Sequence, residues 1–149
     1  MEEEKKRCQK KVMVAIDERG CSYHALMWVL KNLKESITKS PLVIFAAQPL
    51  PEYRYFTFAA ELGFAHMYCP LLATSDLVDS VKKKNKKVAR GLLEKAKGIC
   101  ARQGVKVETV TEVGDPKETI CNAVEKYEIS LLVVGDQANG ILQSLLVWT

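Results

Sequence analysis

Residues 11–33 read "KVMVAIDERGCSYHALMWVLKNL" and contain a complete strand, turn and helix start. The segment 11–17 is almost continuously apolar and rich in β-branched side chains, which is typical of a strand covered on both faces in a parallel sheet. Ser22 follows a short polar turn and is expected to cap a helix. Apolar residues then recur at helical spacing: Ala25, Leu26, Val29, Leu30, Leu33 and Ile37. The stretch predicts the first strand–helix unit of an α/β fold.

Three further strands are predicted downstream, at 42–48, 105–113 and 129–135. The first and last are continuously apolar and are expected to be buried. The segment 105–113 alternates between apolar and polar residues, so it is expected to be more exposed.

Two helices separate these strands. A long one is predicted from Thr74 or Ser75 to its C-cap residue Gly104. Another begins at Asp115, whose carboxylate precedes a proline suited to the first helical turn. Residues 52–73 lack a sustained period and are interpreted as a partly ordered insertion. The alternation of strands and helices predicts an α/β protein: an open parallel sheet with helices on both faces.

Composition limits the class of protein. The 149 residues suit one domain, 1–149, with a charged leader at 1–10. No apolar run approaches the roughly 18 residues of a membrane helix, and the leader lacks the apolar core of a secretion signal. Five cysteines without a Cys-x-x-Cys pair indicate reduced thiols. We therefore expect a cytoplasmic protein, with the nucleus as a further location, and no membrane partner.

Candidate ligand-binding residues follow the strands, because ligands of open parallel sheets bind at the carboxyl ends of the strands. The carboxylate of Asp17 can accept hydrogen bonds from ribose hydroxyls or an adenine amine. Backbone groups near Ala47 can read an adenine edge, and Gly114 follows the third strand. Backbone amides between Gly135 and Gly140 can meet a phosphate. The alternative is that Asp17 caps a turn and Gly135 permits one.

Three blocks carry a resemblance to a known family: residues 12–33, "EVGDPKETI" at 112–120 and "LLVVG" at 131–135. In this order they resemble the universal stress proteins of the plant type, over nearly the whole chain from Lys11. The resemblance implies a Rossmann-like sheet of the HUP type with strand order 3-2-1-4. It also implies AMP or ATP as ligand, with Asp17 at the ribose or adenine and Ala47 contacting adenine through its backbone.

The loop after the fourth strand departs from the family's pattern, which is G-x-x-G, nine residues, then G-S or G-T. Gly135 matches the first glycine, but Ala138 and Trp148 stand at the second and third. Gly140 matches a glycine common in plant members, and Thr149 keeps the hydroxyl. Ala138 loses backbone freedom, and the Trp148 indole is expected to occupy phosphate space. The resemblance therefore implies a weakened phosphate clamp beside an intact adenosine end.

Other chemistry is poorly supported. The run "KKKNKK" at 82–87 is interpreted as a solvated helix face rather than a nucleic-acid patch, because no aromatic residues interleave it. His24 and His66 belong to no ligand cluster, so no metal is predicted. No nucleophile–base pair is evident, so we expect a protein that is not an enzyme, with weak ATPase activity as a distant alternative.

Two hypotheses of function remain. The first is an adenine-nucleotide-responsive, stress-response binding protein. The second is a nucleotide-independent interaction scaffold that keeps the fold. Adenine nucleotide is the expected ligand in the first.

The end of the chain raises a question of assembly. The segment after Gly135 looks helical, and the family's fifth strand, typically used to pair two subunits, is expected to be missing. The fourth strand would then be an unpaired apolar edge, which favours association. We expect either another chain along this edge, in a homodimer or with another protein partner, or a cover formed by 141–149.

Overall fold

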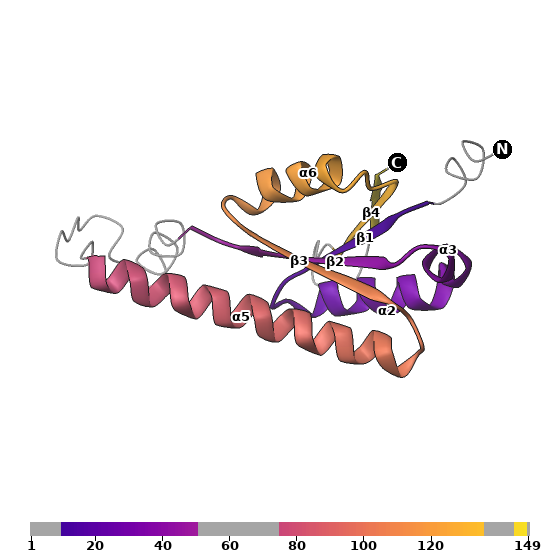
Figure 1. Cartoon of the computed structure of the whole chain (residues 1–149), viewed down its shortest axis with the longest axis horizontal. Coiled ribbons are helices and arrows are strands. Elements are labelled where there is room, and N and C mark those ends of the chain that lie inside the picture. Colours follow the sequence, from indigo (N-terminus) through magenta and orange to yellow (C-terminus); the bar gives the residue numbers. More distant parts are fainter. Residues whose placement is uncertain (1–9, 51–74, 136–144, 149) are drawn as a thin grey trace.

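The computed structural model describes residues 10–50, 75–135 and 145–148 (Figure 1). In chain order the elements are β1 (Val12–Ile16), α2 (Gly20–Asn32), α3 (Lys34–Lys39), β2 (Leu42–Gln48), α5 (Ser75–Arg102), β3 (Val107–Val113), α6 (Pro116–Lys126), β4 (Leu131–Gly135) and β5 (Leu145–Trp148). The predicted insertion at 52–73 lies outside the described residues.

The sheet has the order β3-β2-β1-β4-β5. Its first four strands are parallel, which confirms the predicted order 3-2-1-4 and the adjacency of the first and fourth strands. Val14 of β1 pairs with Ile44 on one side and with Val133 on the other, and all three side chains are fully buried. Such burial explains why these strands are continuously apolar in the sequence.

The expected absence of a fifth strand is wrong. β5 pairs antiparallel with β4, so that Gly135 lies opposite Leu145 and Leu132 opposite Trp148. The segment 145–148 is therefore a strand and not part of a helix. It covers the β4 edge, as expected in the alternative in which the end of the chain forms the cover. Only residues 136–144 join the two strands, whereas a crossover to a parallel strand needs about a dozen residues or more. The short connection explains the antiparallel direction.

Helices cover both faces of the sheet (Figure 1). One core cluster lies between the sheet and α2, α3 and α5, and it includes Leu30, Ile37 and Cys100. Burial raises the pKa of the Cys100 thiol to about 11, so this thiol stays protonated at neutral pH. The other cluster packs Met13 and Phe45 of the sheet against α6.

The predicted boundaries of α5 and α6 hold. α5 ends before Gly104, whose φ of 71° suits glycine, and the Asp115 side chain accepts a hydrogen bond from the Glu118 N–H at 3.4 Å. The single helix expected through Ile37 is broken at Leu33 (φ −115°, ψ 28°), which separates α2 from α3. The break changes the direction of the chain while Ile37 still reaches the core, with 2% of its surface exposed.

Gly135 holds the end of β4 directly against the first turn of α2. A Cβ placed there would collide with the carbonyl oxygen of Cys21 and lie 2.9 Å from the Ser22 nitrogen. No side chain fits between the two backbones, so glycine is required at this position for packing. The hypothesis that Gly135 merely permits a turn therefore understates its structural role.

We predict that Gly135→Ala lowers the free energy of unfolding by about 1–3 kcal/mol, because the added methyl must displace α2 from β4. Urea denaturation measures the change. Gly98→Ala is the matched control: Gly98 lies within α5, and a methyl group added there would meet nothing within 4 Å. Alanine at this position should stabilise the helix by up to about 1 kcal/mol. Equal stability changes for the two variants would contradict the packing role.

Candidate functional site

A cavity of about 750 Å³ lies at the carboxyl ends of β1, β2 and β4. This volume falls within the usual range of small-molecule sites. The described residues of its wall come from the three strand ends, the turn before α2, the middle of α5 and the start of α6. Asp17, Ala47 and Gly135, three of the residues predicted from the sequence, all lie in this wall.

The Asp17 carboxylate is bound by Arg19, two residues further along the same turn. Oδ1 accepts a hydrogen bond from the Arg19 backbone N–H at 2.8 Å, and Oδ2 accepts one from Nε at 2.8 Å. The second guanidinium contact, from Nη2 to Oδ2, measures 2.7 Å. The Asp17 and Arg19 side chains remain 44% and 59% exposed, respectively, so solvent screens the pair and it contributes about 0.2–1 kcal/mol.

Ser22 fixes the backbone of this turn. It was expected to be the N-cap of the helix, but the helix begins at Gly20 and Arg19 occupies the N-cap position without a side-chain cap. The Ser22 hydroxyl instead accepts a hydrogen bond from the Asp17 N–H at 3.2 Å. It lies 3.0 Å from the Asp17 carbonyl oxygen and 2.9 Å from that of Arg19, either of which can take its proton. Ser22 thus determines where Asp17 is presented.

The charges around the cavity are mixed. Asp17, Glu18 and Asp115 are acidic wall residues, and Arg19 and Lys117 are basic ones. Two helix N-termini, those of α2 and α6, adjoin the same wall and favour an anion. The described wall is therefore suited to a polar, partly anionic molecule rather than to a densely charged one.

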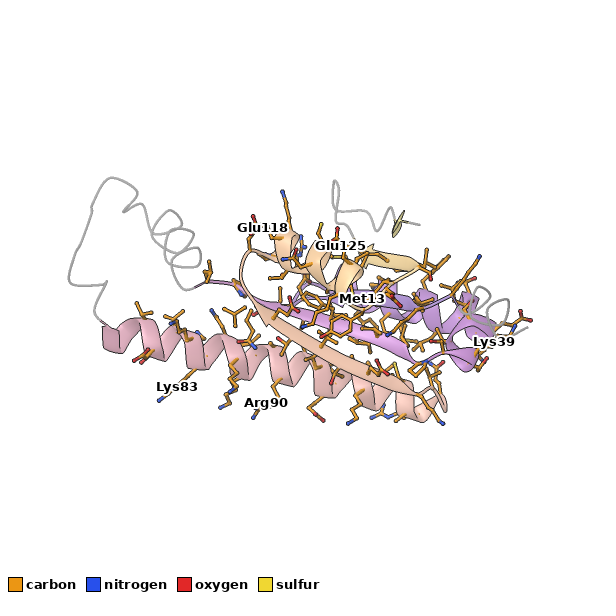
Figure 2. The ribbon with its side chains drawn as sticks, turned by 45° about the horizontal axis from the view of Figure 1, so that its top comes forward. Met13, Lys39, Lys83, Arg90, Glu118 and Glu125 are labelled. Carbon is orange, nitrogen blue, oxygen red and sulfur yellow. The ribbon has the colours of Figure 1, made fainter. Side chains whose placement is uncertain are left out.

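Among the wall residues that sequence reasoning missed, Arg19 and Asn85 make side-chain hydrogen bonds at the cavity. Asn85 is 3% exposed although it lies within the lysine-rich run. Its spacing from Ala89, Leu93 and Ala96 is the signal that could have identified it, since all four share the buried stripe of α5. The lysines of the run are exposed as expected, and Lys83 and Arg90 project away from the sheet in Figure 2.

None of the other predicted site residues belongs to the described part of the wall. Gly114 is not among the described wall residues; its φ of 151° requires glycine, and its N–H donates to the Gln48 carbonyl oxygen at 3.0 Å. Ala138, Gly140 and Thr149 lie outside the described residues, so their roles remain predictions.

Only the backbone of Trp148 is described, so the expectation that its indole fills the phosphate space stays a prediction. The Trp148 backbone pairs with Leu132, three residues before Gly135, which is roughly 10 Å along the strand. The antiparallel direction of β5 therefore places the residue at the third motif position toward the amino end of β4.

The described residues also bear on other classes of function. They contain no group of three or more His, Cys, Asp or Glu side chains that could hold a metal ion. No helix among them is long and apolar enough to cross a membrane.

An open α/β sheet with a cavity at the carboxyl ends of its central parallel strands defines a protein of the Rossmann-like class. The sequence profile of the universal stress protein family matches residues 9–147, and the chain belongs to that family. No curated protein matches the chain at a significant level.

Solved structures show the same fold. A universal stress protein family protein from Arabidopsis thaliana with AMP bound is 22% identical and superposes with a TM-score of 0.59, over 90% of this chain and 81% of its own. UspA from Lactobacillus plantarum gives 14% identity and a TM-score of 0.63, over 91% and 83%. A universal stress protein in complex with cAMP gives 17% and 0.55, over 85% and 75%.

We predict that Ser22→Ala lowers the free energy of unfolding by about 1–3 kcal/mol, because the part-buried Asp17 N–H loses its partner. Urea denaturation measures this loss. Thr38→Ala is the control, since Thr38 is exposed and its hydroxyl contacts only backbone carbonyls of its own helix. If both variants unfold at the same urea concentration as the unmodified chain, Ser22 does not hold the turn.

Proposed function

We propose that this protein is a stress-response binding protein that takes an adenine nucleotide into the cavity between β1, β2 and β4. The observation that carries the proposal is the convergence of Asp17, Ala47 and Gly135 on one cavity of about 750 Å³. Relatives of the same fold have AMP or cAMP bound, which supports this ligand class.

The adenosine side of the site rests on Asp17. Ribose hydroxyls can donate to its carboxylate in place of the Arg19 guanidinium. The exposed Asp17–Arg19 pair contributes only about 0.2–1 kcal/mol, so little stability is lost when a ribose replaces the guanidinium. The exchange frees the guanidinium to approach a phosphate.

The phosphate side is weaker, and we infer that AMP binds at least as well as ATP. Three of the five charged residues in the described wall are acidic, so each added phosphate meets carboxylates as well as cations. The third motif position lies in β5 opposite Leu132 and is displaced from Gly135. A backbone amide at that position is poorly placed to extend a phosphate clamp.

The site supports binding rather than turnover. Its described wall contains no histidine or cysteine, and the Ser22 hydroxyl is engaged with backbone groups. We extend the proposal to a cytoplasmic or nuclear location and to a homodimer or another protein partner, through which occupancy of the cavity would be communicated.

A nucleotide-independent scaffold is the second candidate. The Asp17–Arg19 pair favours it, because the carboxylate already has three contacts without any ligand. Under this alternative the pair closes the turn and no nucleotide binds.

Isothermal titration with AMP and ATP separates the two candidates. We expect AMP to bind at least as tightly as ATP. Asp17→Asn should lower the affinity for AMP by about tenfold to a hundredfold, because the ribose loses a charged acceptor. Asp79→Asn is the control, since Asp79 is an exposed carboxylate of α5 outside the cavity wall. A clear preference for ATP would show that the phosphate clamp works, and absence of binding would favour the scaffold.

Arg19→Ala tests the exchange. Removing the competing guanidinium should raise the affinity for adenosine several-fold, while the ratio of AMP to adenosine affinity falls because a phosphate cation is lost. Both affinities come from calorimetry. Arg90→Ala, on the outer face of α5 (Figure 2), should change neither. An unchanged AMP-to-adenosine ratio in Arg19→Ala would exclude the phosphate role of Arg19.

A further inference from the structure

Asn85 is the polar member of an otherwise apolar helix stripe. It is 3% exposed, and the stripe continues through Ala89, Leu93 and Ala96 with 2%, 7% and 4% exposure. Asn85 also belongs to the cavity wall, together with Ala47 and Pro49 at the end of β2. A buried amide at the edge of a cavity has to satisfy both its donors and its acceptor.

The orientation of this amide follows from one hydrogen bond. The Asn85 Nδ2 donates to the Pro49 carbonyl oxygen at 3.0 Å. A carbonyl oxygen can only accept, so the nitrogen and not the oxygen must face Pro49. The other end of the amide is therefore Oδ1, and it is fixed as an acceptor.

The Asn85 Oδ1 is buried and has no hydrogen-bond donor in the described part of the chain. An unsatisfied buried acceptor is unfavourable, and the hydrogen bond from Nδ2 to Pro49 does nothing to satisfy Oδ1. Neighbouring lysines of the same run are exposed and do not satisfy it. A donor supplied by a ligand accounts for the oxygen, because Asn85 already lines the cavity.

We propose that Asn85 determines base specificity in the cavity: its Oδ1 accepts a hydrogen bond from the exocyclic amino group of a 6-aminopurine. The inference rests on the proposed nucleotide site and identifies a residue that selects its base. A 6-oxopurine presents an acceptor at the same edge, so two oxygens would face each other. Rotating the amide to avoid this contact would turn Oδ1 toward the Pro49 carbonyl and break the existing hydrogen bond. Asn85 therefore favours a 6-aminopurine through a hydrogen bond and disfavours a 6-oxopurine through repulsion between two oxygens.

The unmodified chain provides the first test, with three purine ribonucleoside monophosphates in calorimetry. AMP carries the 6-amino group, purine riboside 5′-monophosphate has hydrogen there, and IMP has an oxo group. We expect AMP to bind about tenfold more tightly than purine riboside monophosphate, and IMP to bind more weakly still. Equal affinity for AMP and purine riboside monophosphate overturns the role of Asn85 while the nucleotide site stands. Binding of none of the three overturns the site and this inference together.

The variant Asn85→Leu provides the second test, since leucine has a similar volume and no polar atoms. AMP affinity should fall to the level of purine riboside monophosphate, whose own affinity stays unchanged. Asn32→Leu is the matched control, because Asn32 is exposed on α2 and bonds only the Trp28 carbonyl oxygen. Circular dichroism establishes that both variants are folded. A uniform loss of affinity for all three nucleotides in Asn85→Leu would indicate a structural role and overturn specificity.

Discussion

The contact of Gly135 with the first turn of α2 is the constraint on which the site depends. It brings two backbones together without an intervening side chain, so the end of β4 and the start of the first helix have one relative position. The turn that leads from β1 into α2 carries Asp17, and Ser22 in the first turn of α2 accepts a hydrogen bond from the Asp17 N–H. Packing of the two backbones therefore fixes this wall of the cavity independently of any ligand.

Two acceptors of different character lie in this wall. The Asp17 carboxylate is partly exposed and already satisfied by an exchangeable partner, whereas the Asn85 oxygen is buried and has no donor among the described residues. The Asn85 oxygen has one fixed orientation, so it favours a ligand that brings a donor to that point. The exposed Asp17–Arg19 pair is weak, so a ligand can replace Arg19 reversibly under the proposed function. Together they are the basis for the proposed ligand, which has hydroxyl donors at one end and an amino donor at the other, as in adenosine.

β5 shows how connection length alters a familiar architecture. Residues 136–144 are too few for a crossover, so the last strand returns antiparallel and covers the β4 edge. β5 has four residues, so in the described part of the chain the outer edge of the sheet on this side is short and offers few backbone groups to a further strand. The direction also moves Trp148 away from Gly135, a consequence that counting along the motif does not reveal.

The sequence by itself determined the four parallel strands, their order, the boundaries of α5 and α6, and the presence of Asp17, Ala47 and Gly135 at the carboxyl ends of strands. The strands, the helix boundaries and the strand-end residues depend on local periodicity and capping among neighbouring residues, whereas the strand order followed from the resemblance to the family. Only the tertiary structure decided that Arg19 binds Asp17, that Asn85 is buried beside Pro49, and that β5 is antiparallel. Each of these depends on how the chain turns in space, because side-chain partners and strand direction are selected by the groups that packing brings together.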